Sequence, residues 1–274
     1  MKNIIITAGP TNERIDAVMK ITNMSTGALG CRIAEKLLSR PDTYPHIGKI
    51  WYISPKMARK PEDWWDGKLE FIQAESTDDL LDALTELLTT EKIDAVIHSA
   101  AVGDYKGKYV ARAEDLADEI AGSLFTVQMA ALAKKKPIPE DTIRQVVLDI
   151  LDSPKAMQDD STKISSYEPH LMVALGLTEK VISHIKRLSP STMLIAFKLL
   201  EGVTKEKLFQ VASALKDKNQ ADFIIANDLA KIGGGKHWAM VVGADPKTGK
   251  NTVVKECQDK DGIADTIADI VSTC

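Results

Sequence analysis

The chain has 274 residues, of which 44% are hydrophobic, so it can build a substantial core and is not a disordered chain. Its 35 basic and 39 acidic residues are spread along the sequence and give a net charge of −4, which argues against a basic surface for nucleic acid. The three cysteines, Cys31, Cys257 and Cys274, lack C-x-x-C spacing, which argues against a disulfide framework and a zinc site. No apolar run approaches the about 18 residues of a membrane span. We therefore expect an unprocessed cytoplasmic protein.

Short β-branched runs alternate with longer segments of helical spacing along most of the chain. The runs predict buried strands at Asn3–Thr7, Ile50–Ser54, Leu69–Gln73, Ile93–His98, Met193–Phe197 and Asp222–Ala226. The segments between them predict helices at Gly27–Ser39, Asp78–Thr89, Thr178–Lys186, Lys205–Lys218 and Ile263–Ser272. This order predicts an α/β fold, a Rossmann-like and mostly parallel sheet with helices on both faces.

Two segments depart from this rhythm. Residues 106–162 are predicted to hold two helices, split at Pro137 and Pro139, which would form a helical insertion or lid. The segments His237–Gly243 and Thr252–Glu256 flank a turn-rich stretch and predict a late antiparallel β-hairpin that caps one edge of the sheet. We expect residues 1–274 to form a single domain that carries this insertion.

In a parallel sheet, ligands bind beyond the carboxyl ends of the strands, so the loops there are the first candidates for a site. The first loop contains Gly9 and leads to "NMSTGALG", in which the amides of Ser25, Thr26 and Gly27 precede a helix and favour an anion. An ordinary helix start, with Ser25 or Thr26 as N-cap and Gly30 allowing close packing, explains the stretch equally well. Neither G-x-G-x-x-G nor G-x-x-x-x-G-K-[ST] is present.

The strand Ile93–His98 is followed by small residues and an acid, in "HSAAVGDY". Asp104 can accept a hydrogen bond from a base or a ribose, or help to hold a metal, although a plain acidic loop residue is the simpler alternative. His98 at the strand end is interpreted as a structural imidazole in preference to a catalyst.

Later positions offer weaker signals. Lys163 could place a cation against phosphates, and Phe197 could stack on a base, but a loop lysine and a core phenylalanine are the alternatives. Lys216 and Lys218 lie at a helix end before a strand that terminates near Asn227.

The order of these segments makes the chain resemble phosphopantothenate–cysteine ligases (phosphopantothenoylcysteine synthetases). The segments are "TAGPTNERID", "ITNMSTGALG", "HSAAVGDY", "TKISS", "IAFKLLEG" and "ADFIIANDL". The resemblance spans the chain apart from residues 106–160. The family's first-loop pattern, T-x-G-x-T-x-E-x-I-D followed by I-[ST]-N-x-S-[ST]-G-x-x-G, is matched here by Thr7, Gly9, Thr11, Glu13, Ile15, Asp16, Asn23, Ser25, Thr26, Gly27 and Gly30.

The resemblance implies a ligase that joins the carboxylate of 4′-phosphopantothenate to the amine of cysteine. In this family the carboxylate attacks the α-phosphate of a nucleoside triphosphate, pyrophosphate leaves, and cysteine then displaces the nucleoside monophosphate. Mg²⁺ and lysine cations stabilise the charge that develops on the phosphates. CTP is the expected co-substrate in preference to ATP, because bacterial members generally use CTP.

The resemblance also implies roles for individual residues. Asn23 and Lys163 are the expected catalytic residues, and Asn23 is expected to donate its amide to a developing oxyanion. The expected nucleotide-binding residues are His98, Ser99, Ala100, Asp104, Lys163, Thr178, Glu179, Lys180, Val181, Phe197, Lys216 and Lys218. The expected substrate-binding residues are Gly9, Asn23, Ser25, Thr26, Gly27, Ala101 and Asn227, and no metal ligand is assigned.

The chain departs from the family pattern at two places. "AFKLLEG" stands where the family has "GFAAET", and the insertion separates Asp104 from Lys163. We expect the free-standing bacterial form of the ligase, a homodimer whose late hairpin is a plausible dimer arm, with a separate phosphopantothenoylcysteine decarboxylase as a possible partner.

Two other functions remain as alternatives. An NAD(P)-binding oxidoreductase has the same fold class, but the chain lacks its glycine fingerprint, and Ser54-Pro55 stands where an acidic ribose-binding residue is expected. The spacing Tyr52-x-x-x-Lys56 occurs in dehydrogenases but is interpreted as a chance match, because Pro55 lies inside it. A non-catalytic nucleotide-sensing domain would keep Asp104 and need neither Asn23 nor Lys163.

Overall fold

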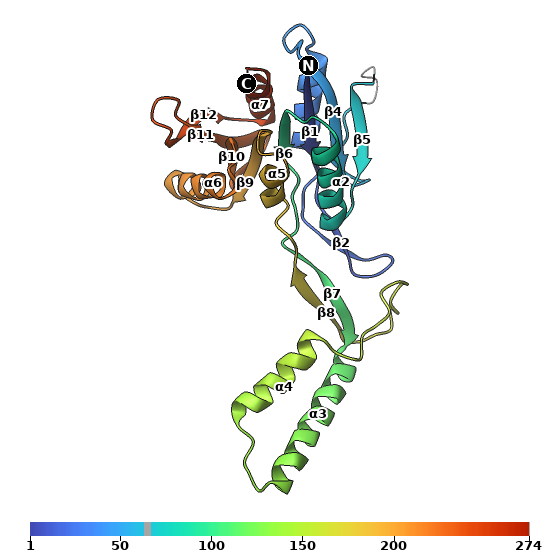
Figure 1. Cartoon of the computed structure of the whole chain (residues 1–274). Coiled ribbons are helices and arrows are strands. Elements are labelled where there is room, and N and C mark those ends of the chain that lie inside the picture. The colour runs from blue at the N-terminus through green and yellow to red at the C-terminus, as the bar shows by residue number, and fades with distance from the viewer. Residues whose placement is uncertain (63–66, 274) are drawn as a thin grey trace. The chain divides into compact units, whose positions relative to one another are not determined.

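The computed structural model describes residues 1–62 and 67–273, and the chain in it divides into two compact units (Figure 1). The first unit comprises Met1–Asn12, Thr22–Asp104 and Glu179–Cys274, and it contains the main sheet. The second comprises Glu13–Ile21 and Tyr105–Thr178. That residues 1–274 act as one ligase domain stays a prediction.

The first unit is built on an eight-stranded sheet in the order β12-β11-β10-β9-β6-β1-β4-β5. Strand β1 pairs in parallel with β4 and β6, and β9 pairs in parallel with β6 and β10. The predicted Rossmann-like, mostly parallel α/β fold is therefore confirmed. The strands are β1 (Lys2–Thr7), β4 (Ile47–Ser54), β5 (Leu69–Gln73), β6 (Ala95–His98), β9 (Met193–Leu200), β10 (Phe223–Gly233), β11 (Lys236–Ala244) and β12 (Asn251–Cys257).

The central strands are apolar on both faces, as a sheet covered on both sides requires. In β1, Ile4 and Ile6 pack into the core on one face, while Ile5 packs into a second core on the other. All three side chains are fully buried. Since neighbouring residues of a strand point to opposite faces, this continuous β-branched run determines a two-sided strand.

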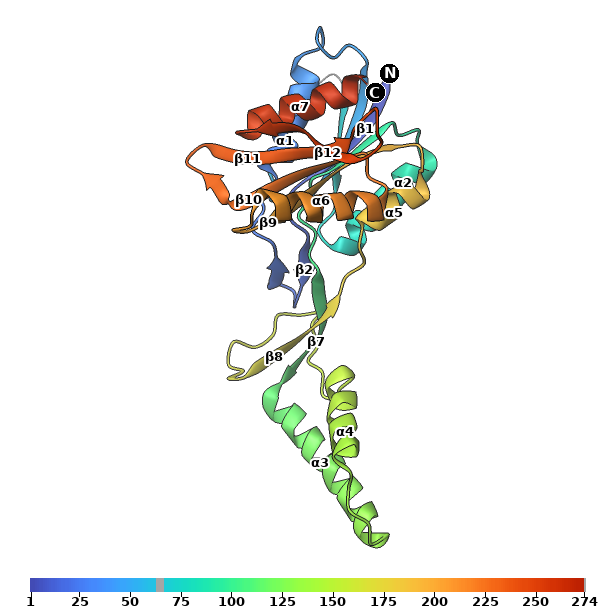
Figure 2. The same cartoon turned by 90° about the vertical axis from the view of Figure 1, so that its left-hand side faces the viewer.

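Helices cover both faces of this sheet (Figure 2). Helices α1 (Ala28–Ser39) and α7 (Lys260–Thr273) pack on one face. Helices α2 (Thr77–Thr90), α5 (Ile182–Leu188) and α6 (Lys205–Asn219) pack on the other. The five predicted helices are confirmed, except that α5 begins at Ile182 and not at Thr178, because the preceding segment is extended as far as Leu177.

The end of the chain forms antiparallel strands, as predicted. Strand β11 pairs antiparallel with both β10 and β12, and β12 is an edge of the sheet. Strand β10 runs to Gly233, well beyond its predicted end, because Ile232 and Gly233 pair with the start of β11. Gly234 and Gly235 have positive φ angles of 58° and 85°, which lets the chain reverse between the two strands.

The second unit contains the predicted insertion and two strands that were not predicted from the sequence. Helices α3 (Ala113–Ala133) and α4 (Glu140–Asp152) are separated near Pro137 and Pro139, which confirms the predicted split. The predicted start of the insertion is wrong, because residues 106–112 belong to β7 (Tyr105–Arg112), which pairs antiparallel with β8 (Leu171–Leu177). Lysine and arginine side chains interrupt the apolar pattern of β7, and the short apolar run of β8 cannot be told from a helix by its period.

Two three-residue strands, β2 (Asn12–Arg14) and β3 (Lys20–Thr22), pair with each other and were also missed. The turn between them is organised by Asp16, whose Oδ1 accepts hydrogen bonds from the amides of Val18 (2.7 Å) and Met19 (2.6 Å). The turn forms through local hydrogen bonds to an aspartate side chain. The strands beside it have three residues each, which is too short to show a hydrophobic period in the sequence.

Candidate functional site

The loop after β1 and the loop before α1 meet at two glycines with positive φ, Gly9 (80°) and Gly27 (74°). A Cβ on Gly9 would lie 2.6 Å from Cβ of Ala58, and one on Gly27 would lie 3.1 Å from the amide nitrogen of Gly9. Both positions therefore require glycine, for conformation and for space. The result is a close approach of two backbone segments beside the amino end of α1.

Gly27 is the N-cap residue of α1, so the prediction that Ser25 or Thr26 caps this helix is wrong. A capping side chain needs an extended backbone at the N-cap, and the left-handed Gly27 occupies that position instead. The hydroxyls of Ser25 and Thr26 accept only long local hydrogen bonds, each 3.4 Å, from the amides of Gly27 and Ala28.

Gly30 allows α1 to pack closely on the sheet, as predicted. A Cβ at this position would lie 2.6 Å from Cβ of Ala8 and 2.8 Å from Oγ of Ser99. The first turn of α1 therefore lies directly against the ends of β1 and β6. An amino end of a helix in this position favours an anion, because its first amides have no partner within the helix.

Asn23 joins the loop before α1 to the loop after β6. Its Nδ2 donates to the carbonyl oxygens of Ala101 and Val102, both at 3.1 Å. Two carbonyl acceptors fix the orientation of the amide, with Nδ2 toward them and Oδ1 away. Both amide hydrogens are thus used inside the protein, and the outward group is an acceptor. This differs from the expected role of Asn23 as a donor to an oxyanion.

The loop after β6 is held against the loop after β1 by a ladder of hydrogen bonds. Ser99 donates to the carbonyl oxygen of Thr7 through its amide (3.1 Å) and through Oγ (2.7 Å). The amide of Ala100 donates to Oγ1 of Thr7 (3.2 Å), and that of Ala101 donates to the carbonyl oxygen of Gly9 (2.8 Å). Further along, the amide of Gly103 donates to Oγ1 of Thr11 (2.8 Å).

The two threonine hydroxyls in this ladder were matched to the family motif but not assigned a site role. Thr7 and Thr11 are both buried; Thr7 is the last residue of β1, and Thr11 directly follows Pro10. A hydroxyl at the end of a buried strand, and a second one in the loop that follows it, are the signals that could have identified them.

His98 is buried at the end of β6, and its Nδ1 lies 2.9 Å from Oγ1 of Thr7. Burial lowers the pKa of the imidazole to about 4, so it is neutral near pH 7. A neutral, buried and hydrogen-bonded ring agrees with the interpretation of His98 as structural. A role in nucleotide binding stays a prediction for this residue.

The acid of the HSAAVGDY loop is paired with a lysine from the segment before α5. Oδ1 of Asp104 lies 2.5 Å from Nζ of Lys180, and both side chains are largely exposed. Glu179 pairs with His184 at 2.9 Å, whereas Val181 is buried in the core behind α5. An exposed pair such as Asp104 and Lys180 contributes little to stability, so both groups are available to a ligand.

Phe197 and Asn227 lie on the neighbouring strands β9 and β10. Phe197 is partly buried and packs against the core on the face of α1 and α7. The Nδ2 of Asn227 lies 2.7 Å from Nε2 of His237, whose pKa is lowered by burial and by the charge of Lys260.

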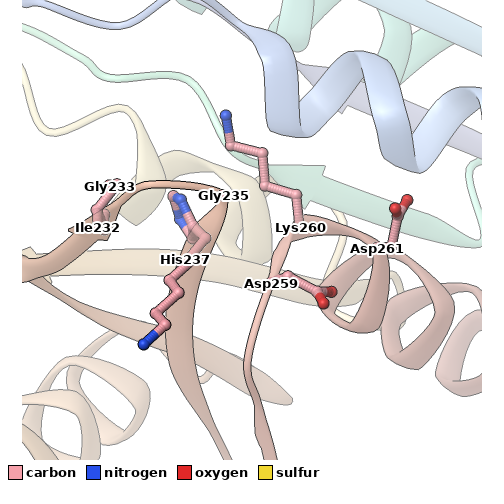
Figure 3. A pocket seen from close by; sticks show the side chains of 8 residues that line it. Ile232, Gly233, Gly235, His237, Asp259, Lys260 and Asp261 are labelled. Atoms are coloured by element: carbon pink, nitrogen blue, oxygen red, sulfur yellow. The ribbon is translucent and has the colours of Figure 1, made fainter.

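His237 lines a cavity of about 370 Å³ (Figure 3). The residues labelled in Figure 3 come from the end of β10, the turn after it, the start of β11, and the start of α7 with the residue before it. Its two acids already have partners, since Asp261 pairs with Arg32 and Asp259 accepts a hydrogen bond from the amide of Gly262. A hydrogen bond from an amide leaves the carboxylate of Asp259 charged, so Lys236 and Lys260 together give the lining a net positive charge that Asp259 offsets only in part. The cavity lies at the carboxyl ends of β10 and β12.

Lys216 and Lys218 are not brought to these loops. They lie in the last turn of α6, which starts after the carboxyl end of β9 and ends before β10 begins. The carbonyl oxygen of Lys216 accepts a hydrogen bond from the amide of Ala221, at the start of the next strand. Both lysines therefore lie at the amino ends of the parallel strands, opposite to the carboxyl ends from which the loops of the candidate site emerge.

Lys163 and Thr178 belong to the second unit. The exposed Lys163 precedes Ile164, whose amide donates to Oδ2 of Asp16 at 3.0 Å. Burial raises the pKa of Asp16, but three backbone hydrogen bonds and the charge of Lys163 outweigh it and lower the pKa. Asp16 of the first-loop motif thus holds the segment that carries Lys163.

The dehydrogenase-like spacing from Tyr52 to Lys56 has no catalytic geometry. Tyr52 is fully buried, and its hydroxyl donates to the carbonyl oxygen of Arg59 at 2.8 Å. Burial raises the pKa of this phenol far above its ordinary value. Tyr52 is therefore a structural residue.

Within residues 1–62 and 67–273 there is no group of three or more His, Cys, Asp or Glu side chains that could hold a metal ion. A search of the same residues for a helix of sufficient length and apolarity to span a membrane found none.

The structure thus brings together the first unit's loops that carry Gly9, Asn23–Gly27 and Ser99–Ala101. The cluster consists of backbone amides, small side chains and hydroxyls at the amino end of a helix. Such a surface can bind an anionic group and orient it, and Asn23 adds an amide oxygen that accepts hydrogen bonds.

Comparisons with known proteins agree on one family. Residues 1–115 match the model of the DNA/pantothenate metabolism flavoprotein C-terminal domain. The chain is 25% identical over 244 residues, 89% of its length, to the coenzyme A biosynthesis bifunctional protein CoaBC of Thermococcus kodakarensis. It spans only 45% of that relative's length.

Two solved structures extend the likeness to the whole chain. The DNA/pantothenate metabolism flavoprotein from Streptococcus pneumoniae is 31% identical, with a TM-score of 0.72, over 99% of this chain and 98% of that one. The Cab2 mutant H337A in complex with phosphopantothenate-cysteine has a TM-score of 0.58 over 98% of this chain and 87% of that one. At 14% identity, the second shows a shared fold alone.

Proposed function

Because this chain belongs to the DNA/pantothenate metabolism flavoprotein C-terminal domain family, we propose that it is a phosphopantothenate–cysteine ligase in coenzyme A biosynthesis. The reaction forms an amide between the carboxylate of 4′-phosphopantothenate and the amine of L-cysteine through an acyl-nucleotide. The name of the Thermococcus relative and the ligand named for the Cab2 structure both support this choice.

One observation carries the proposal. The segments that resemble the ligase motifs, "ITNMSTGALG" and "HSAAVGDY", lie far apart in sequence and are joined by the two hydrogen bonds from Asn23 to Ala101 and Val102. A ligase has to hold a carboxylate and a nucleotide phosphate side by side, since the first step joins them. Two loops fixed against each other at the end of one sheet provide such a place.

The position of Asn23 supports a role in the second step. Its amide nitrogen holds the loop after β6, and its Oδ1 is left as an acceptor. An acceptor can bind an N–H of the attacking cysteine amine and orient the nitrogen toward the acyl carbon. In this account Asn23 fixes the loop and orients the nucleophile.

Charge on the phosphates has to be neutralised, and cations of the chain contribute to this. Lys180, beside Asp104 in the first unit, is the cation proposed for this role. Lys163 keeps the catalytic role that the resemblance implies, and in the second unit the amide of the next residue, Ile164, donates to Asp16. Mg²⁺ is expected to arrive bound to the nucleoside triphosphate, where it neutralises the phosphate oxygens, as this ion usually takes few protein ligands. Asp104 is the exposed carboxylate nearest to these loops in sequence and fits a single ligand of that kind.

CTP is proposed as the co-substrate in preference to ATP, on the resemblance to bacterial ligases. A homodimer, a cytoplasmic location and a separate decarboxylase partner belong to the same proposal.

The test measures pyrophosphate release and amide formation by the purified protein. Pyrophosphate is expected only when 4′-phosphopantothenate, Mg²⁺ and a nucleoside triphosphate are all present, and the amide only after cysteine is added. Parallel reactions with CTP and ATP decide the nucleotide. No pyrophosphate with either nucleotide would refute the ligase proposal.

A further inference from the structure

The turn after β4 carries three cations and lies outside every motif that supports the family resemblance. It reads Pro55-Lys-Met-Ala-Arg-Lys60 and follows Ser54, the last residue of β4. Since β4 is parallel to β1, this turn lies at the same edge of the sheet as Gly9. Ala58 of this turn packs directly against Gly9 and Gly27. A Cβ on Gly9 would lie 2.6 Å from the Cβ of Ala58, and a Cβ on Gly27 would lie 3.2 Å from it.

Arg59 is anchored to the loop before α1 through its backbone. Its amide donates to the carbonyl oxygen of Thr26 at 2.9 Å, and its carbonyl oxygen accepts from the buried hydroxyl of Tyr52 at 2.8 Å. These two bonds fix the position of the main chain beside Thr26 and Gly27. They leave the side chain uninvolved in holding the turn.

The main chain of Arg59 bonds to Thr26, the residue before the N-cap of α1, so its side chain starts within reach of the first turn of that helix. Burial dominates the pKa of the Cys31 thiol and raises it to about 12, but the charge of Arg59 acts on the same thiol in the opposite direction. Cys31 is in that first turn, and its amide donates to the carbonyl oxygen of Gly27 at 3.0 Å. A Coulomb effect of this kind requires the two groups to be near each other.

Arg59 differs from its neighbour in the same turn in what its side chain contacts. In the part of the chain that the structure describes, no carboxylate forms an ion pair with Arg59. Lys60, by contrast, is placed over the ring of Phe71, with Nζ 5.6 Å from its centroid. Lys60 is therefore directed at an aromatic ring, whereas Arg59 lies beside the loops of the candidate site without an ion-pair partner among the described residues.

We propose that Arg59 binds a phosphate group of a substrate at the amino end of α1. The inference rests on the proposed ligase function, which supplies two phosphate-bearing substrates, 4′-phosphopantothenate and the nucleoside triphosphate. A guanidinium is suited to this role, because its planar fork donates two parallel hydrogen bonds to phosphate oxygens. The backbone amides beside Gly27 and the side chain of Arg59 would then approach the same anion from two loops.

The experiment compares Arg59→Gln with Lys60→Gln, which removes the same charge from the same turn. Isothermal titration calorimetry measures the binding of 4′-phosphopantothenate, pantothenate, Mg–CTP, Mg–ATP and inorganic pyrophosphate, each added alone. Arg59→Gln is expected to weaken the phosphate-bearing ligand about 10- to 100-fold, the usual effect of losing a hydrogen bond to a charged group. Pantothenate, which lacks the phosphate, should bind both variants and the natural protein equally.

The ligand that is weakened identifies the phosphate. Loss confined to 4′-phosphopantothenate assigns Arg59 to the 4′-phosphate, and loss confined to the nucleotide assigns it to the triphosphate. Unchanged dissociation constants for every phosphate-bearing ligand, or equal losses in Lys60→Gln, would overturn the proposal. Pyrophosphate binding separates this result from failure of the ligase function, because it tests Arg59 even if the protein makes no amide. An unchanged thermal midpoint of Arg59→Gln verifies that the variant is folded.

Discussion

Replacing Asn23 by aspartate tests the role of this side chain with almost no change of shape. In the structure Nδ2 donates to the carbonyl oxygens of Ala101 and Val102, both at 3.1 Å. The aspartate would present a carboxylate oxygen to the same two acceptors, so both hydrogen bonds are lost and repulsion replaces them. Each bond is worth about 0.5–1.5 kcal/mol, and since Asn23 is exposed we take the lower part of this range. A total of about 1–2 kcal/mol corresponds to about a 5- to 30-fold lower rate of amide formation.

The two half-reactions are measured separately, pyrophosphate release in the first turnover and amide formation after cysteine is added. We expect amide formation to fall in the order natural protein, Asn23→Ala, Asn23→Asp, since alanine removes the bonds without adding repulsion. Pyrophosphate release should be affected less, so the acyl-nucleotide persists. Met24→Ala changes the next residue, which is 98% exposed, and should leave both rates unchanged. An Asn23→Asp enzyme with the natural rate of amide formation would refute this reasoning.

Two further predictions concern stability. Gly30→Ala places a Cβ 2.6 Å from Ala8 and 2.8 Å from Ser99, so denaturant unfolding should show a loss of about 1–3 kcal/mol. Gly122→Ala in α3, with no heavy atom within 4 Å of the new Cβ, should instead gain about 0.5–1 kcal/mol, and equal effects would contradict the packing argument. For His98, the unfolded imidazole takes up a proton near its ordinary pKa of 6.5, whereas the folded one does so only near 4. The unfolded state therefore binds more protons between these values, and about 3 kcal/mol of stability should be lost as the pH falls from 6.5 to 4. His98→Gln should lack this loss, and an identical pH profile in the variant would count against it.

The main sheet could be predicted from the sequence because its strands are buried on both faces. Ile4, Ile5 and Ile6 are all fully buried, so the run is continuously apolar and stands out from the helical segments around it. The ribbon of β7 and β8 could not be recognised in this way. Charged residues lie between the apolar ones in β7, and only Tyr109, Val110 and Ala111 are buried there.

The candidate site was predicted in part. The loops after β1 and β6 carry the predicted residues Gly9, Asn23 and Ser99, which the structure holds in one cluster. The direction of the Asn23 amide depends on carbonyl groups 78 and 79 residues away in the chain, so no local pattern reveals it. The role proposed for Arg59 could not be predicted, although its turn also follows a parallel strand, because no motif marks it.

The most direct test of the central claim is pyrophosphate release by the purified protein in single-omission reactions. The ligase account predicts release with 4′-phosphopantothenate, Mg²⁺ and CTP together, none when any one is omitted, and phosphopantothenoylcysteine only when cysteine is present. Pyrophosphate release that does not depend on 4′-phosphopantothenate, or no release with either CTP or ATP, would contradict it.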